Sequence, residues 1–496
     1  MNRHMLVRGA ALAGLVLALG ACDQGLTEVN VDPNAPTDVG PEYILPHTIE
    51  TGVGRICCSR GMLDDWAQQT SEIQYAEETI GNVRPADMNN MWSGFYGTDL
   101  EDAQTIIDKG MADGKANIQG VGMIWKEWLF SQLTDLFGNV PYSEALQGAD
   151  NTTPAYDAQS DIYAGMLQNL TDAQAMLGGS GGGDFGGGDI FYGNDFGKWK
   201  KFANSLRMRL AMRMSEVDPA TAEAEFVAAY NAGGFTSNDD NAQLVWPGDP
   251  YGNPNWENCI CGNGVRDDNA VSATLIDTLQ SLNDPRLKFY AEPNTDPAAP
   301  DIYYGEINGD HTPDHPLGWY SRIGNYWRAD GQSTPSIIMS YSEVLFLEAE
   351  AAWRGWISAD PATLYNKAVQ AAFDMYISTG YATAPTEAER DAYLQNPRVV
   401  YNTGDANAAF EQIQLQKWLS LYQVGMEAWT NWRRVRIPYL QPGPDLAAGL
   451  AGITTIPVRV PYPAMEQSLN NDNLMAAVQH QGGGLGLVTA MWWDMN

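Results

Sequence analysis

Apolar side chains recur at helical spacing in four separate stretches of the chain. Positions three and four residues apart share one face of a helix, so each stripe predicts an amphipathic helix packed against a neighbour. The stripes are Val121, Ile124, Trp125, Trp128, Leu129 and Leu133; Trp199, Phe202, Leu206, Leu210 and Met214; Tyr341, Leu345, Phe346, Ala349, Ala352, Trp353 and Trp356; and Leu415, Trp418, Leu419, Tyr422 and Met426.

Start and stop signals divide these stretches into separate helices. The second stripe ends at Asp218-Pro219, and the third stops near Gly355, before Asp360-Pro361 begins another helix. Adjacent helices of this length are typical of tetratricopeptide-like hairpins, in which stacked pairs bury a continuous core. No clean repeat of 34 residues is visible, so the pattern predicts only the architecture: a mainly α fold of helical hairpins in an α/α superhelix.

Four long segments interrupt the helical pattern, at about 75–94, 178–198, 236–270 and 290–336. Loops of this length in a compact protein are usually functional or disordered. These segments are rich in Trp, Tyr, Asn and Gly, a composition suited to recognition. We therefore expect a loop-rich, ligand-binding half beside the helical scaffold.

The first residues have the pattern of an export signal. Arg3 and Arg8 precede a short apolar run over 10–19, and small residues then lead to Cys22. This pattern predicts a signal peptide over 1–21 with a lipobox, and a mature chain that begins at a lipidated Cys22. The alternative is an ordinary signal peptide with a coincidental cysteine. Residues 22–45 then form a lipidated start and an extended tether, and 46–496 a single domain.

The composition limits the possible partners. After Cys22 no apolar stretch reaches the roughly 20 residues of a transmembrane helix, so the lipid is the expected membrane attachment. The formal net charge of −33 argues against nucleic acid and favours a neutral or cationic ligand. Aromatic residues make up 10% of the chain, and exposed rings often serve as flat apolar platforms in binding proteins.

The cysteines after Cys22 form two close pairs, Cys57 with Cys58 and Cys259 with Cys261. In an oxidising compartment we expect disulfides between the two pairs, although four cysteines allow three pairings. Free thiols or a four-thiolate metal site are the alternatives, but neither pair has the two-residue gap usual at zinc.

Three further motifs give weak signals. Residues 181–186 match a dinucleotide-binding glycine pattern, but no strand precedes them and no helix opens on them. Asp184, Asp189 and Asp195 lie among glycines as in calcium-binding repeats, which makes calcium a minor possibility in a chain for which we expect no cofactor. His311 and His315 have a zinc-helix spacing that intervening prolines make implausible.

Several motifs together resemble the SusD/RagB family, in particular its SusD-like lipoproteins. They occur in the family's order across almost the whole chain: residues 30–34 (NVDPN), 133–145 (LTDLFGNVPYSEA), 192–195 (YGND), 199–207 (WKKFANSLR), 283–287 (NDPRL), 342–351 (SEVLFLEAEA), 427–429 (EAW), 433–434 (RR), 456–459 (IPVR), 462–463 (YP) and 492–494 (WWD). Within them, Glu343, Glu348, Glu350, Arg433 and Arg434 lie on or beside apolar helix faces. Since buried charges persist when paired, these residues are better candidates for internal ion pairs than for catalysis.

The resemblance implies a non-catalytic lipoprotein on the surface of a bacterial outer membrane. Such a protein binds a nutrient, an oligosaccharide or other glycan more readily than a peptide, and delivers it to a SusC-like TonB-dependent transporter. The glycine-rich insert and the cysteine pairs depart from the family's polysaccharide-binding members and leave the ligand open. A surface glycoside hydrolase is an alternative, because paired carboxylates cannot be recognised without the structure. A structural or adhesive protein is another.

We expect the ligand face to use aromatic residues of the irregular segments. Aromatic residues on helix stripes, such as Trp125 and Trp353, should be consumed by packing, whereas those in loops lack a periodic partner and more of them should face solvent. The candidates are Tyr75, Trp92, Tyr251, Trp256, Trp319, Tyr320, Tyr326 and Trp327.

Overall fold

A computed structural model describes residues 38–57, 61–248, 250–254, 256, 267–298 and 300–496. The predicted signal peptide and Cys22 lie outside these residues, as do Cys58, Cys259, Cys261 and the side chain of Cys57. The lipid anchor and the disulfides therefore stay predictions.

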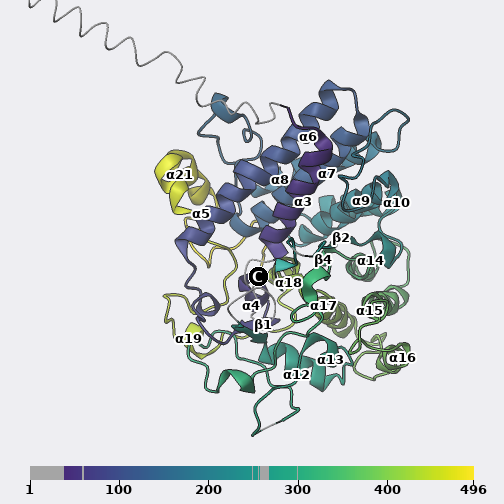
Figure 1. Cartoon of the computed structure of the whole chain (residues 1–496), viewed down its shortest axis with the longest axis vertical. Coiled ribbons are helices and arrows are strands. Elements are labelled where there is room, and N and C mark those ends of the chain that lie inside the picture. Colours follow the sequence, from purple (N-terminus) through teal and green to yellow (C-terminus); the bar gives the residue numbers. More distant parts are fainter. Residues whose placement is uncertain (1–37, 58–60, 249, 255, 257–266, 299) are drawn as a thin grey trace, which may run out of the picture.

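Long helices form the larger part of the molecule, from the top of Figure 1 down its right side. Consecutive helices pack on each other as hairpins: α6 on α7, α7 on α8, α8 on α9, α9 on α10, and α14 on both α15 and α17. The prediction of a mainly α fold is confirmed. The helices are α3 (Pro41–Cys57), α6 (Glu101–Ala112), α7 (Ala116–Phe137), α8 (Gln159–Met176), α9 (Phe196–Arg213), α10 (Pro219–Ala232), α14 (Tyr341–Arg354), α15 (Pro361–Ile377), α16 (Glu387–Leu394), α17 (Ala406–Ser420) and α18 (Gly425–Val435).

Shorter elements and long connections form the rest of the molecule, mostly toward the bottom and left of Figure 1, with β2 and β4 near its centre. The elements are α4 (Met62–Trp66), α5 (Pro85–Gly94), α12 (Ala273–Ser281), α13 (Leu287–Tyr290), α19 (Pro444–Ala447), α20 (Ala464–Leu469), α21 (Asn471–His480), and strands β1 (Thr70–Glu72), β2 (Ala242–Leu244), β3 (Asn269–Val271) and β4 (Ser336–Met339). The strands form two antiparallel pairs, β1 with β3 and β2 with β4. Within the described residues, no helix has the length and apolar character needed to cross a bilayer.

Most of the predicted helices occur where the stripes place them. The stripe around Trp125 is α7, and Trp125 is fully buried as expected. The side chain of Asp360 caps α15 by accepting a hydrogen bond from the Thr363 amide, and Gly355 ends α14 at a φ of 81°. The fourth stripe is wrong as one helix, because the chain breaks between Ser420 and Gly425 and continues as α18.

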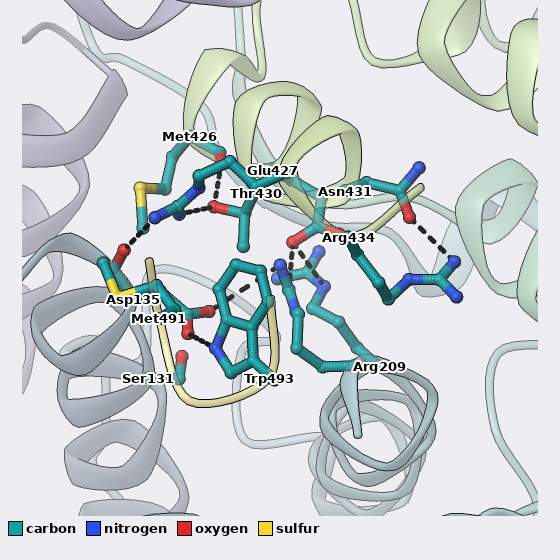
Figure 2. A network of polar contacts seen from close by, with 12 residues as sticks. Ser131, Asp135, Arg209, Met426, Glu427, Thr430, Asn431, Arg434, Met491 and Trp493 are labelled. Atoms are coloured by element: carbon teal, nitrogen blue, oxygen red, sulfur yellow. Dashed lines mark hydrogen bonds and ion pairs between the residues drawn. The ribbon is translucent and has the colours of Figure 1, made fainter. Parts of the chain in front are cut away.

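Charged side chains are buried where α9, α14, α17 and α18 meet. Arg209 pairs with Glu343 at 2.6 Å, and Arg213 on α9 pairs with Glu427 at 2.7 Å. Figure 2 shows part of this network from close by, with Arg209 and Glu427 labelled. The arginine face of α9 is thus buried as well as its apolar stripe. The buried arginines are tolerated because each has a carboxylate partner inside the protein.

The predicted pairing of the family's charged residues is partly confirmed. Glu343 is paired, and Glu350 lies 2.6 Å from Arg434; burial alone raises the pKa of Glu350, but Arg434 lowers it to about 2. Arg433 is held differently: it donates to the carbonyl oxygens of Asp135 and Val458 and lies 3.4 Å from the centre of the Trp429 ring.

Trp493 and Asp494 complete this buried centre. Trp493 is fully buried, and its Nε1 donates to Asp135 Oδ1 at 3.0 Å. The guanidinium of Arg433 lies 4.9 Å from the Trp493 ring centre, and Asp494 pairs with Arg436 at 2.9 Å. Residues near position 493 thus pack against α7 and α18, which lie far earlier in the sequence.

Candidate ligand-binding face

A small irregular sheet organises the loop-rich half. Strand β1 pairs with β3, and single antiparallel bridges join Ala270 to Arg322 and Ala291 to Ile323. Ile73, Ala270 and Tyr320 pack together in a small apolar cluster of their own. Segments about 250 residues apart in the sequence are brought together in this way, and three of the predicted ligand residues, Tyr75, Trp319 and Tyr320, lie on or beside them.

An aromatic group lies at one end of this sheet. His315 and Trp319 stack with ring centres 4.7 Å apart, and the Tyr304 ring meets the edge of Trp319 at 6.1 Å. Tyr320 is buried beneath them and its hydroxyl accepts from the His315 amide at 3.1 Å, so it supports the group. Tyr304 is 39% exposed, and Trp319 is half-buried. We call Tyr304, His315 and Trp319 the aromatic platform.

Tyr75 follows β1 and is 65% exposed. Its backbone has a φ of 57°, a left-handed conformation that is uncommon for a tyrosine. Such strained residues persist only where the surroundings hold them, and they cluster at functional sites. Tyr75 therefore presents a large ring surface on a segment that the fold holds in an unfavourable conformation.

A group of ion pairs lies on the same irregular sheet. Asp267 accepts from Arg328 at 2.7 Å and from Arg322 at 3.1 Å, and Arg322 bridges to β3 through Ala270. Burial raises the pKa of Asp267, but hydrogen bonds and charge from the two arginines lower it below its usual value. The aspartate is thus ionised at neutral pH, and the group adds hydrogen-bonding charge to the sheet that carries the aromatic platform.

Tyr326 and Trp327 lie at a second location, a cavity. They line a cavity of about 680 Å³ between the loop-rich half and α15, together with Tyr376, Tyr422 and Asn238. Trp327 is only 5% exposed, and its ring meets those of Tyr376 and Tyr422 edge-on at 5.9 and 5.3 Å. These rings contact one another and leave little surface for stacking on a ligand.

Tyr251 and Trp256 lie on a third segment. Asn253 anchors it by donating to the carbonyl oxygens of Gln332 and Thr334, each at 2.8 Å. Tyr251 is 58% exposed, and Trp256 is half-buried near Gly331. Both side chains are therefore at least partly exposed to solvent.

Trp92 does not have the predicted loop position. It lies on helix α5, within the segment 75–94 that the sequence pattern makes irregular, and is 4% exposed. Its ring contacts those of Tyr96, Phe137 and Tyr462. Neighbouring side chains cover this tryptophan, as they cover those of the helix stripes. The expectation that aromatic residues of the irregular segments face solvent is therefore wrong for Trp92.

Sequence reasoning missed Tyr304 and considered His315 only as a metal ligand. Tyr304 lies in the irregular segment 290–336 and, like its aromatic neighbours there, belongs to none of the helical stripes. The pattern that selected those neighbours therefore also selects Tyr304. The calcium hypothesis finds little support, since Asp189 accepts from the Phe191, Tyr192 and Asn194 amides and Asp195 caps α9. No group of three His, Cys, Asp or Glu side chains with metal-binding geometry occurs in the described part of the chain.

Comparison with known proteins matches this architecture to one family. The family model described as "Starch-binding associating with outer membrane" matches residues 43–463. A solved structure named "chitin-binding protein" is 32% identical, with a TM-score of 0.80 over 92% of this chain and 100% of that one. A chitin-binding SusD homolog from Flavobacterium johnsoniae is 24% identical, with a TM-score of 0.79 over 91% and 99%. A SusD homolog from Bacteroides fragilis is 25% identical, with a TM-score of 0.78 over 92% and 99%. No curated protein matches significantly. The chain therefore belongs to the SusD-like family.

Proposed function

We propose that this protein is a non-catalytic, surface-anchored glycan-binding lipoprotein whose ligand is an oligosaccharide of the chitin type. The observation that carries the proposal is the presence of exposed aromatic rings and of charged hydrogen-bonding groups on the same irregular sheet. A sugar ring has apolar faces that stack on aromatic side chains, and hydroxyl groups around its edge that need donors and acceptors. Tyr75, Tyr304 and Trp319 supply the first, and Asp267 with its two arginines supplies the second.

The chitin-type ligand rests on the comparisons. The 32% identical relative is named for chitin binding, and so is the homolog from Flavobacterium johnsoniae. Chitin is uncharged, which also suits a chain with a net charge of −33. Family membership supports the further proposal that the bound glycan passes to a SusC-like TonB-dependent transporter in the outer membrane.

Isothermal titration with chitohexaose tests the ligand. Trp319→Ala should lower the affinity at least tenfold, about 1.4 kcal/mol, because it removes the central ring of the platform. Trp353→Ala is the matched control: this tryptophan is also half-buried, but it lies on α14 in the helical scaffold. Equal affinities in both variants and the unmodified protein, with unfolding unchanged, would place the ligand elsewhere.

Two further measurements test the rest of the proposal. Incubation with chitohexaose should release no new reducing ends, whereas a hydrolase would release them steadily. Cys22→Ser should free the protein from outer membranes and abolish its co-purification with a β-barrel transporter. Recovery of the Cys22→Ser protein in the membrane fraction would contradict the lipid anchor.

A further inference from the structure

Buried carboxyl groups gather under the segment that carries Tyr75. Asp65 on α4 is 1% exposed, Glu72 at the end of β1 is 9% exposed, and Glu78 is 7% exposed. One carboxyl oxygen of each, Asp65 Oδ2, Glu72 Oε2 and Glu78 Oε2, is buried with no hydrogen-bond partner among the described residues. A buried carboxyl oxygen without a hydrogen-bond donor destabilises the folded state, so we expect a donor to these oxygens.

Among the described residues, positive charge at this place is scarce. Arg84 donates to Glu78 Oε1 at 2.6 Å, and its side chain is 56% exposed. It also lies 3.4 Å from Asp87, and the carboxyl group of Glu77 faces Glu72 as a further negative charge. One exposed arginine, already shared, cannot neutralise three buried carboxylates.

The remaining contacts supply donors but no charge. Asp65 Oδ1 accepts from the Thr70 hydroxyl at 2.6 Å. Asp64, next to Asp65, accepts from the Gly425 amide at the start of α18, and burial raises the pKa of Asp64 to about 7. The hydroxyl and amide donors do not reach the three orphaned oxygens, and a proton shared between two of the carboxyl groups would satisfy those two.

Glu72 and Glu78 are the pair placed to share a proton. Their carboxyl groups lie within hydrogen-bonding range of each other. Burial, followed by the charges of Asp65 and Glu78, raises the pKa of Glu72 to about 10. Two buried carboxyl groups in contact repel each other when both carry a charge, so Glu72 keeps its proton and can donate it to Glu78.

The pair brackets Tyr75 symmetrically in the sequence. Glu72 lies three residues before it and Glu78 three residues after it. We propose that Glu72 is a positioning residue for the ligand face: a proton shared between Glu72 and Glu78 ties together the two ends of the turn at 73–77 and holds the Tyr75 ring in its exposed, left-handed conformation. The expected effect on ligand binding rests on the proposed function, whereas the expected effect on the position of the Tyr75 ring does not.

Loss of the shared proton should release the turn. Two negative charges in contact repel each other strongly in a buried place, so the ends at 72 and 78 separate and the unfavourable backbone of Tyr75 relaxes. Glu72→Gln keeps a donor to Glu78 but does not titrate. Glu72→Ala removes the bond at every pH.

A fluorine label reports on the position without any ligand. With p-trifluoromethyl-phenylalanine at position 75, the ¹⁹F NMR line should shift between about pH 7 and pH 10 in the otherwise unmodified protein, following the raised pKa of Glu72. The Glu72→Gln line should stay constant over the same range, and the Glu72→Ala line should already lie at the high-pH position at pH 7. An identical pH profile with Glu72 and with Gln at this position, or an Ala line matching the unmodified one at pH 7, overturns the inference.

Binding gives the second readout. At pH 7, Glu72→Gln should bind chitohexaose as the unmodified protein does, and Glu72→Ala about tenfold more weakly. Normal binding by Glu72→Ala overturns the inference. If no variant binds while the ¹⁹F profiles behave as expected, the proposed ligand is wrong and the positioning role stands.

Discussion

Neutralising Glu427 should destabilise the protein strongly, because this residue balances several buried cations. Its carboxylate lies 2.7 Å from Arg213, 3.5 Å from Arg209 and 3.8 Å from Lys417, and all four side chains are buried. Figure 2 shows the carboxylate at the centre of the network. In Glu427→Gln the shape is kept and the charge is lost, so the cations remain buried with one counter-charge fewer.

The magnitude follows from the pKa of this group. Burial raises the pKa of Glu427, but the charges of Arg213, Arg209 and Lys417 more than compensate and lower it from 4.5 to about 2. At about 1.4 kcal/mol per pH unit, the ionised form gains about 3 kcal/mol in the folded state. Breaking a buried ion pair typically costs about 3–5 kcal/mol, so the two arguments agree.

Chemical denaturation followed by tryptophan fluorescence measures this loss. A lowered folded-state pKa contributes stability in full above pH 4.5 and loses it as the pH falls toward 2. The difference in unfolding free energy between unmodified protein and Glu427→Gln should therefore be largest near pH 7 and shrink as the pH falls through this window. Glu411→Gln, on an exposed face of α17, is the control and should change stability by less than about 0.5 kcal/mol.

The reasoning is refuted if Glu427→Gln unfolds within about 1 kcal/mol of the unmodified protein at pH 7. A large difference that does not vary with pH down to the acid limit of folding also refutes it, since packing and not charge would then be responsible.

Three other outcomes follow from the fold. Trp92→Ala should cost about 3–5 kcal/mol of unfolding free energy, seen by denaturation, with chitohexaose affinity unchanged while the protein is folded. Asp195→Ala removes the α9 cap and should cost about 1 kcal/mol, equally with and without calcium in the buffer; a calcium-dependent loss would revive the metal hypothesis. Replacement of Trp493 by Ala should cost about 3–5 kcal/mol by differential scanning calorimetry, and a melting temperature that does not move would contradict its role in the core.

Sequence pattern was sufficient for helices whose neighbours lie close in the chain. The stripe of α7 and the Asp360-Pro361 start of α15 depend on local spacing and local capping, and both occur as predicted. The stripe through Trp418 and Tyr422 wrongly predicted a single helix. Residues on both sides of the break between α17 and α18 face the core, so the apolar periodicity continues across it. For Trp92 the signal was present: Met88, Met91 and Trp92 follow helical spacing behind Pro85, a favoured first residue of a helix.

The candidate face could be predicted only in part. Exposed rings such as Tyr75 and Tyr251 follow from their irregular surroundings, but no local rule distinguishes Trp319 on the platform from Trp327 in the ring cluster. The difference arises from strand bridges between segments about 250 residues apart, and sequence spacing carries no information about such pairings. Buried arginines such as Arg209 were also hidden, since their partners are distant in the sequence.

The position of Trp493 sets a limit on when this chain can finish folding. The buried centre between α7 and α18 needs that indole, both for the hydrogen bond to Asp135 and for the ring beside Arg433. Until Trp493 has been synthesised, two buried ionic groups lack a neighbour and the helical scaffold cannot reach its final packing. We therefore expect nascent chains to stay loosely packed until Trp493 has been added, a state that suits passage through a narrow translocation channel.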